Sequence, residues 1–210
     1  MHNYEYVPQK VAEPLKKEII ELLHLVQDEV KPYFTFRFDP VGSSSRNMIT
    51  WEPDRNIGFD FDYNIEPNDP NEKYKAYEIH NIIFEAIRKH MGKFGYSKIE
   101  ASTSAITIKA IDRDNRRIEH SCDFAIVHHF NDGQQQYIKM DKFYRTTINW
   151  QLRDNDYYIG EKLKWIKKHG LKPKLREIYL DYKNRNNNPQ KKSRTIFAEA
   201  VNDLHNQYNG

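Results

Sequence analysis

The stretch Ile57-Gly58-Phe59-Asp60-Phe61-Asp62-Tyr63-Asn64-Ile65 alternates apolar and polar residues with the two-residue period of a β-strand. Aromatic and aliphatic side chains fall on one face of this predicted strand, which suits a hydrophobic core. Asp60 and Asp62 share the opposite face, with Cα atoms about 6.6 Å apart. Two carboxylates held so close repel each other, and a divalent cation such as Mg²⁺ relieves the repulsion because it takes oxygen ligands. An exposed strand face carrying solubilising acids is the alternative interpretation.

A third acid, Asp123, interrupts the otherwise apolar segment Ser121-Cys122-Asp123-Phe124-Ala125-Ile126-Val127. A carboxylate buried among apolar neighbours needs a partner, because an isolated buried charge is strongly destabilising. If this predicted strand lies beside the strand of Asp60 and Asp62, three carboxylates converge, enough to bind two metal ions about 3.5–4 Å apart. An ion pair with an arginine is the alternative for Asp123.

Upstream, the segment Val41-Gly42-Ser43-Ser44-Ser45-Arg46-Asn47 follows a predicted strand over 34–38 and leads into a short helix predicted to begin among residues 44–47. Glycine allows close approach to the backbone, while serine hydroxyls and the N–H groups of a helix terminus can hold phosphate oxygens. The Gly-Lys-Ser/Thr sequence of a P-loop is missing. The segment is therefore a candidate phosphate contact of a different kind.

The rest of the chain predicts an α+β fold with a helical tail. Apolar residues at three- and four-residue steps predict amphipathic helices over 14–30, with Pro14 in the first turn, and over 72–91. Two consecutive hairpins are predicted from strands over 103–111, 117–130 and 135–140. After Trp150 the pattern predicts helices over 157–169, 174–183 and 194–208. We therefore expect a core domain over 1–150 and a helical domain over 151–210.

Composition excludes several classes of protein. The chain has 210 residues, and 33 Lys and Arg against 30 Asp and Glu leave a net charge of only +3, too small for a strong overall field. The 14 Tyr, 11 Phe and three Trp supply enough core material to exclude global disorder. The single cysteine, Cys122, excludes an intramolecular disulfide and a Cys-only metal cluster. With no run of 18 apolar residues and no signal-peptide pattern, we expect a cytoplasmic protein that does not span a membrane.

The order strand, Gly42-Ser43, short helix, Asp60-Phe61-Asp62 strand, helix, hairpin and Asp123 strand resembles the DNA polymerase beta-like nucleotidyltransferase superfamily. The resemblance covers roughly residues 12–140. The helical tail is similar to that of the oligoadenylate synthase and bacterial cyclic-oligonucleotide synthase branch, or of small bacterial nucleotidyltransferases. The 16 residues between Ser43 and Asp60 are more than usual, and Arg46-Asn47 replaces a frequent Gly-Thr. The resemblance implies a palm-like mixed sheet flanked by helices.

The resemblance also implies roles for individual residues. Asp60 and Asp62 would hold two Mg²⁺ ions, with Mn²⁺ as a substitute, and Asp123 would complete the metal site nearer the attacking hydroxyl. Gly42, Ser43 and Ser44 would grip the phosphates of the nucleotide. Lys164, in a basic segment of the predicted helix over 157–169, is the candidate from the tail for contacting the triphosphate.

These observations leave three hypotheses for function. The leading one is an Mg²⁺-dependent nucleotidyltransferase that moves a nucleoside monophosphate from ATP or another NTP to a hydroxyl of a nucleotide, RNA, small molecule or protein, releasing pyrophosphate. The second is a non-catalytic nucleotide- or RNA-binding module on the same fold. The third is a plain RNA-binding protein that uses the tail lysines with Tyr157 and Tyr158. The small net charge argues against long nucleic acid as an obligatory acceptor.

Overall fold

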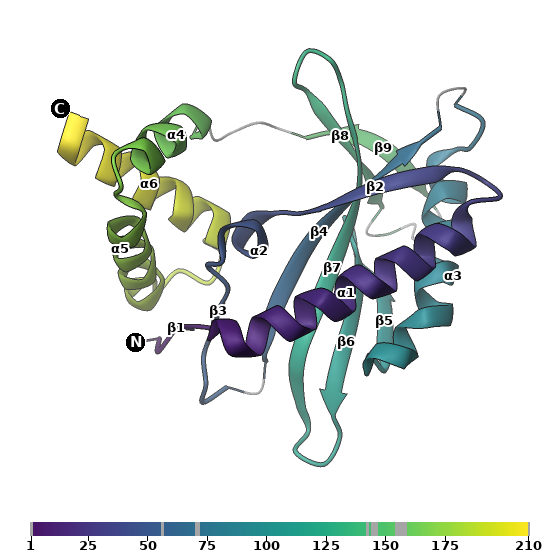
Figure 1. The fold of residues 1–210 in the computed structure, drawn as a ribbon, viewed down its shortest axis with the longest axis horizontal. Helices are drawn as coiled ribbons and strands as arrows, with labels where there is room; N and C mark the ends of the chain where they lie inside the picture. The colour runs from purple at the N-terminus through teal and green to yellow at the C-terminus, as the bar shows by residue number, and fades with distance from the viewer. Residues whose placement is uncertain are drawn as a thin grey trace. The chain divides into compact units, whose positions relative to one another are not determined.

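The computed structural model describes residues 2–55, 57–69, 72–141, 143, 147–153 and 159–209 (Figure 1). The chain has an α+β fold with a mixed sheet and helices, as predicted, and it divides into two compact units. The sheet unit comprises Val7–Ile49 and Asn56–Arg153, and the helical unit comprises Met1–Tyr6, Thr50–Arg55 and Asp154–Gly210. The division into domains over 1–150 and 151–210 stays a prediction.

The sheet unit is built on a seven-stranded sheet whose main path runs β2-β4-β7-β6-β5, with β8 and β9 continuing from the end of β7. Its strands are β2 (Thr35–Pro40), β4 (Phe59–Asn68), β5 (Lys98–Ala101), β6 (Ile106–Asp112), β7 (Arg117–His129), β8 (Gln135–Met140) and β9 (Ile148–Leu152). The central strands β4 and β7 are parallel, and the other pairs are antiparallel. Strands far apart in the sequence therefore lie side by side at the centre of the sheet.

Helices α1 (Gln9–Val30) and α3 (Ala76–His90) lie together over the sheet, and a short 3-10 helix, η1 (Met91–Phe94), follows α3 (Figure 1). Both helices bury an apolar stripe, as the periodicity predicts, and Lys89 of α3 binds Glu29 of α1 at 2.7 Å. The prediction that Pro14 lies in the first turn of its helix is wrong. The helix begins at Gln9, because the buried stripe extends back to Ala12.

The core lies between these helices and one face of the sheet. That face carries side chains that are at most 4% exposed, including Phe59, Phe61, Tyr63, Ile65, Ile106, Ile108, Cys122, Phe124 and Ile126. Cys122 is fully buried among them, which suits an inert core thiol. The predicted alternation is thus confirmed, and Asp60, Asp62 and Asp123 project from the other face.

The helical unit contains α4 (Gly160–Lys168), α5 (Lys172–Arg185) and α6 (Ser193–Asn209), which share a small apolar core. A two-stranded ribbon of β1 (Glu5–Tyr6) and β3 (Thr50–Trp51) belongs to the same unit. Lys183 of α5 fastens the ribbon, since its Nζ donates to Thr50 Oγ1 at 2.6 Å. Tyr157 and Tyr158 lie outside the described residues. None of the described helices is both long and apolar enough to cross a membrane.

Candidate active site

Asp62 and Asp123 are direct register partners across the parallel pair β4 and β7. Asp60 is aligned with Ser121 in the same pair, one step along the sheet. Register partners project from the same face, so the three acids named from the sequence share one open face of the sheet. The adjacency expected for Asp123 is therefore present.

Two hydroxyl groups bind the outer carboxylates. Thr107 of β6 is the register partner of Asp123 on its other side, and its Oγ1 donates to Asp123 Oδ1 at 2.6 Å. The hydroxyl of Ser121 donates to Asp60 Oδ1. The sequence does not predict either hydroxyl contact, because each depends on the pairing of strands that are far apart in the chain. A serine or threonine opposite an acid on a neighbouring strand is the signal that identifies them.

The segment after β2 folds against Asp62. Helix α2 (Gly42–Arg46) begins at Gly42, two residues earlier than the earliest predicted start, and ends before Asn47 in a left-handed conformation. The Val41 N–H donates to the Asp62 carbonyl at 2.9 Å. Gly42 has φ +58°, and a Cβ at this position would lie 3.2 Å from Asp62 Oδ2. The turn therefore needs glycine both for its backbone conformation and for its close approach to the carboxylate.

The serines of this turn have different roles: Ser44 and Ser45 form hydrogen bonds within the fold, and Ser43 remains a candidate for binding phosphate. Ser44 is only 3% exposed, and its Oγ accepts the Asp62 backbone N–H at 2.9 Å, so it fixes the turn to β4. This buried position does not suit the predicted contact of Ser44 with a phosphate. Ser45 donates to the Gly42 carbonyl at 3.0 Å. Binding of phosphate by Gly42 and Ser43 stays a prediction.

Burial and the neighbouring acids raise the pKa values of Asp62 and Asp123. Burial, then Asp123 and Asp60, raise the pKa of Asp62 to about 7, while the nearby Arg46 opposes this shift. Burial and Asp60 also raise the pKa of Asp123, against the lowering effects of the Thr107 hydrogen bond and of Lys109. A raised pKa means that the ionised carboxylates are destabilised at this site, and a divalent cation would stabilise them.

The donor set fits a hard divalent cation by its chemistry, since three carboxylates lie at adjacent register positions on one face. The described residues nevertheless contain no group of three or more His, Cys, Asp or Glu side chains already arranged to hold a metal ion. Asp60 and Asp123 instead hold the hydroxyls of Ser121 and Thr107. Joint coordination by the three acids would therefore use the second oxygens of Asp60 and Asp123, which these hydrogen bonds leave for a metal ion.

Lys164, the nucleotide-binding candidate from the tail, lies on α4 in the helical unit. Its side chain is 78% exposed and its Nζ forms an ion pair with Glu161 at 2.7 Å. The role of Lys164 in contacting a triphosphate stays a prediction. His129, at the end of β7, forms a hydrogen-bonded pair with Glu66 of β4 at 2.8 Å.

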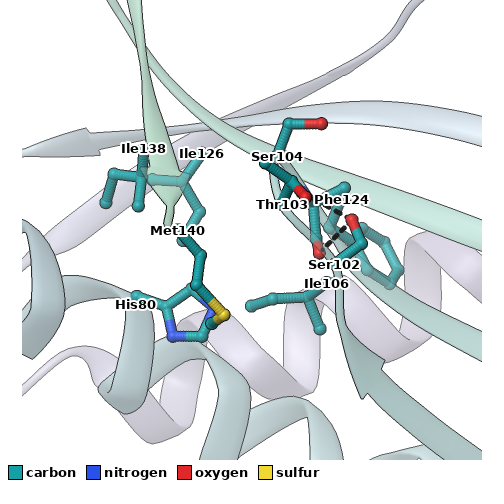
Figure 2. Close-up of a pocket in the computed structure, with 10 residues that line it drawn as sticks. His80, Ser102, Thr103, Ser104, Ile106, Phe124, Ile126, Ile138 and Met140 are labelled. Carbon is teal, nitrogen blue, oxygen red and sulfur yellow. Dashed lines mark hydrogen bonds between the residues drawn. The ribbon is translucent and has the colours of Figure 1, made fainter. Parts of the chain in front are cut away.

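A small cavity on the other side of the sheet does not belong to this site (Figure 2). It has a volume of about 10 Å³, and its lining includes His80 of α3, Met140 of β8 and the loop Ser102-Thr103-Ser104. That volume is about enough for one water molecule and far too small for a nucleotide. No predicted site residue lines it.

Comparison with known proteins finds a likeness in structure only. No family model and no curated protein sequence matches the chain. DncV of Vibrio cholerae in its 3'-deoxy ATP bound form is 17% identical, with a TM-score of 0.57 over 95% of this chain and 53% of that one. Escherichia coli DncV in its 3'-deoxy GTP bound form is 16% identical, with a TM-score of 0.53 over 95% of this chain and 54% of that one.

The CD-NTase CdnG of Bradyrhizobium diazoefficiens in complex with GTP gives a TM-score of 0.51 at 12% identity, over 97% of this chain and 49% of that one. The chain thus spans about half the length of the solved structures it resembles. At these identities the likeness is one of fold. The chain therefore has the fold of DncV and CdnG, which agrees with the α+β fold that the sequence resemblance implies.

Proposed function

We propose that this protein is a Mg²⁺-dependent nucleotidyltransferase that moves a nucleoside monophosphate from an NTP to a hydroxyl acceptor. The observation that carries the proposal is the pairing of Asp62 with Asp123 across β4 and β7, with the Gly42 turn packed against Asp62. The fold supports it, because DncV and CdnG of the same fold are described in nucleotide-bound forms. The three acids, the Gly42 turn and the fold therefore all support nucleotidyl transfer.

Asp60, Asp62 and Asp123 would hold the metal ions, which when bound act as Lewis acids and as a template for in-line displacement. Asp123 lies directly beside Asp62 on β7, between the β4 strand that contacts the Gly42 turn and the β6 strand that carries Thr107. Its Oδ1 accepts the Thr107 hydroxyl, so Oδ2 is the atom that would hold a metal ion near the attacking hydroxyl, whose pKa that ion would lower. Burial and Asp60 raise the pKa of Asp123, and a bound cation would stabilise its ionised form.

The Gly42 turn would bind the phosphates next to Asp62. Because the Ser44 hydroxyl is committed to β4, the available groups of the turn are the backbone at Gly42 and the partly exposed Ser43. Gly42 leaves room beside the carboxylate that any side chain would take. This proximity would bring a phosphate-bound metal and Asp62 together.

A non-catalytic nucleotide-binding module remains the second candidate. It is favoured by one observation, namely that one carboxylate oxygen of Asp60 and one of Asp123 each accept a hydrogen bond from a hydroxyl of the protein itself. The same fold and the same turn would then bind a nucleotide without transferring it.

One experiment separates the two candidates. The purified protein is incubated with each α-labelled NTP, singly and with mixtures of NTPs, RNA and protein as acceptors, in Mg²⁺ or Mn²⁺. Label in a new species from the wild type, absent with Asp60→Ala/Asp62→Ala and present with the exposed-site control Asp39→Ala, supports nucleotidyl transfer. Metal-dependent NTP binding without transfer supports the module. Absence of both transfer and binding overturns the proposal.

A further inference from the structure

The open face of the sheet is organised in two rows of register partners that cross β4, β7, β6 and β5. The first row is Asp62, Asp123, Thr107 and Glu100. The second row is Asp60, Ser121, Lys109 and Lys98. Each row begins with acid on the β4 side, continues through one hydroxyl residue and ends in charged side chains on the outer strands.

The hydroxyl residues are the direct contacts of the acids in each row. Thr107 Oγ1 donates its single proton to Asp123 Oδ1 at 2.6 Å, and the Ser121 hydroxyl donates to Asp60 Oδ1. Both residues are held by regular strand pairing, and Ser121 is only 5% exposed. These donors are therefore fixed in place before any ligand arrives.

The lysines of the second row form ion pairs with Glu100. Lys109 Nζ binds Glu100 Oε2 at 2.5 Å, and Lys98 pairs with the same carboxylate. If Lys109 instead formed an ion pair with Asp60 or Asp123, a permanent cation would neutralise the carboxylates that a metal ion needs. A neutral hydroxyl gives an acid a hydrogen bond without adding this competing charge.

We propose that Thr107 and Ser121 are positioning residues of the carboxylate site, each fixing one oxygen of an aspartate and leaving the other oxygen for a divalent cation. The inference rests on the proposed function only in taking the acids as metal ligands. Groups that orient metal ligands in this way typically change metal affinity tenfold to a hundredfold when removed. Thr107→Val keeps the shape of the side chain, and Thr107→Ser keeps the hydroxyl.

The test measures Mn²⁺ binding to the metal-free full chain by the loss of the free-ion EPR signal, with no nucleotide present. We expect Thr107→Val and Ser121→Ala to raise the dissociation constant about tenfold or more, and Thr107→Ser to restore it. Ser102→Ala is the matched control, because its hydroxyl bonds to the Ala105 carbonyl outside the site. Thermal unfolding confirms that each variant is folded, and a purely structural role would lower the melting temperature without changing Mn²⁺ affinity.

Unchanged Mn²⁺ affinity in both Thr107→Val and Ser121→Ala would overturn the positioning role. So would Mn²⁺ binding by the wild type that Asp60→Ala/Asp62→Ala does not weaken, since the acids would then not be the ligands. If the wild type binds Mn²⁺ through the acids but transfers no nucleotide, the proposed function fails while the positioning role is still decided by the affinities of the variants.

Discussion

Replacing Asp62 with asparagine should stabilise the metal-free protein at alkaline pH. Burial, Asp123 and Asp60 raise the pKa of this carboxyl from 3.8 to about 7 in the folded state. The unfolded chain therefore releases the proton at lower pH than the folded chain does. Ionised Asp62 thus destabilises the fold increasingly as the pH rises from about 4 to 7, and the effect is complete above pH 7.

The size of the effect follows from the same pKa values. A difference between 3.8 and about 7, at about 1.4 kcal/mol for each pH unit, gives about 4 kcal/mol as the largest expected gain at pH 8. At pH 4 the gain should fall to about 0.6 kcal/mol, because the folded state then carries the proton on Asp62 and the unfolded chain is about half protonated there.

Urea unfolding in EDTA at pH 4, 6 and 8 measures this directly as the difference in unfolding free energy between Asp62→Asn and the wild type. Asp39→Asn is the control, since Asp39 is an exposed acid on β2. Excess Mg²⁺ should stabilise the wild type by about 2.7 kcal/mol at a hundredfold excess over its dissociation constant, and Asp62→Asn by less. A difference that is the same at pH 4 and pH 8, or a variant that is less stable at pH 8, would refute the reasoning.

Three further changes test other parts of the site and core. Gly42→Ala should lower the free energy of unfolding by at least about 1 kcal/mol, because φ is +58° and Asp62 lies 3.2 Å from the new Cβ, while Gly92→Ala meets no atom within 4 Å. Lowering the pH from 7 to 4 should reduce the free energy of unfolding of the wild type by about 3 kcal/mol more than that of His120→Phe, because burial lowers the pKa of His120 from 6.5 to about 4. Urea unfolding at the two pH values measures this difference. Glu100→Ala should weaken Mn²⁺ binding severalfold in the EPR assay by releasing Lys109 toward the acids; Glu177→Ala, which breaks an ion pair in the helical unit, should not.

The alternation over residues 59–65 is sufficient to predict which face of the strand enters the core and which face carries the acids, but Ile57 is 53% exposed. It does not give the start of the strand, which lies at Phe59. Gly58 has φ +65°, and a Cβ there would lie 2.5 Å from the Glu119 carbonyl oxygen. That constraint comes from β7, some sixty residues later in the chain, so no local pattern contains it.

The same limit explains why the acids were predictable and their partners were not. Two aspartates spaced two apart on a strand reveal a shared face by periodicity alone. The contacts of Thr107 with Asp123 and of Ser121 with Asp60 depend on how β6, β7 and β4 are aligned. The Ser44 hydroxyl could pass for a phosphate ligand for the same reason, because its bond to the Asp62 N–H exists only in the folded turn.

The stretch between Ser43 and Asp60 shows a second limit. Its unusual length suggests an insertion but does not predict where the inserted residues lie in the fold. Thr50–Arg55 belongs to the helical unit, where β3 pairs with β1 and buried Glu52 binds His2 at 2.9 Å and Arg55 at 3.2 Å. Strands β1 and β3 have two residues each, which is too short to show an alternating pattern, and they are more than forty residues apart, so the sequence does not predict their pairing.

The charge arrangement of the open face links stability to ligand binding. Among the described residues, Arg46 is the cation that opposes the raised pKa of Asp62, and it does not restore the ordinary value. The two lysines of the second row are bonded to Glu100, so the acids receive hydroxyl hydrogen bonds instead of ion pairs. A direct lysine partner would lower the raised pKa values of Asp62 and Asp123. Keeping them unneutralised is destabilising without a ligand, and a divalent cation would recover that free energy on binding. The increase in unfolding free energy on adding Mg²⁺, and the smaller increase expected for Asp62→Asn, therefore both report the electrostatic repulsion at Asp62.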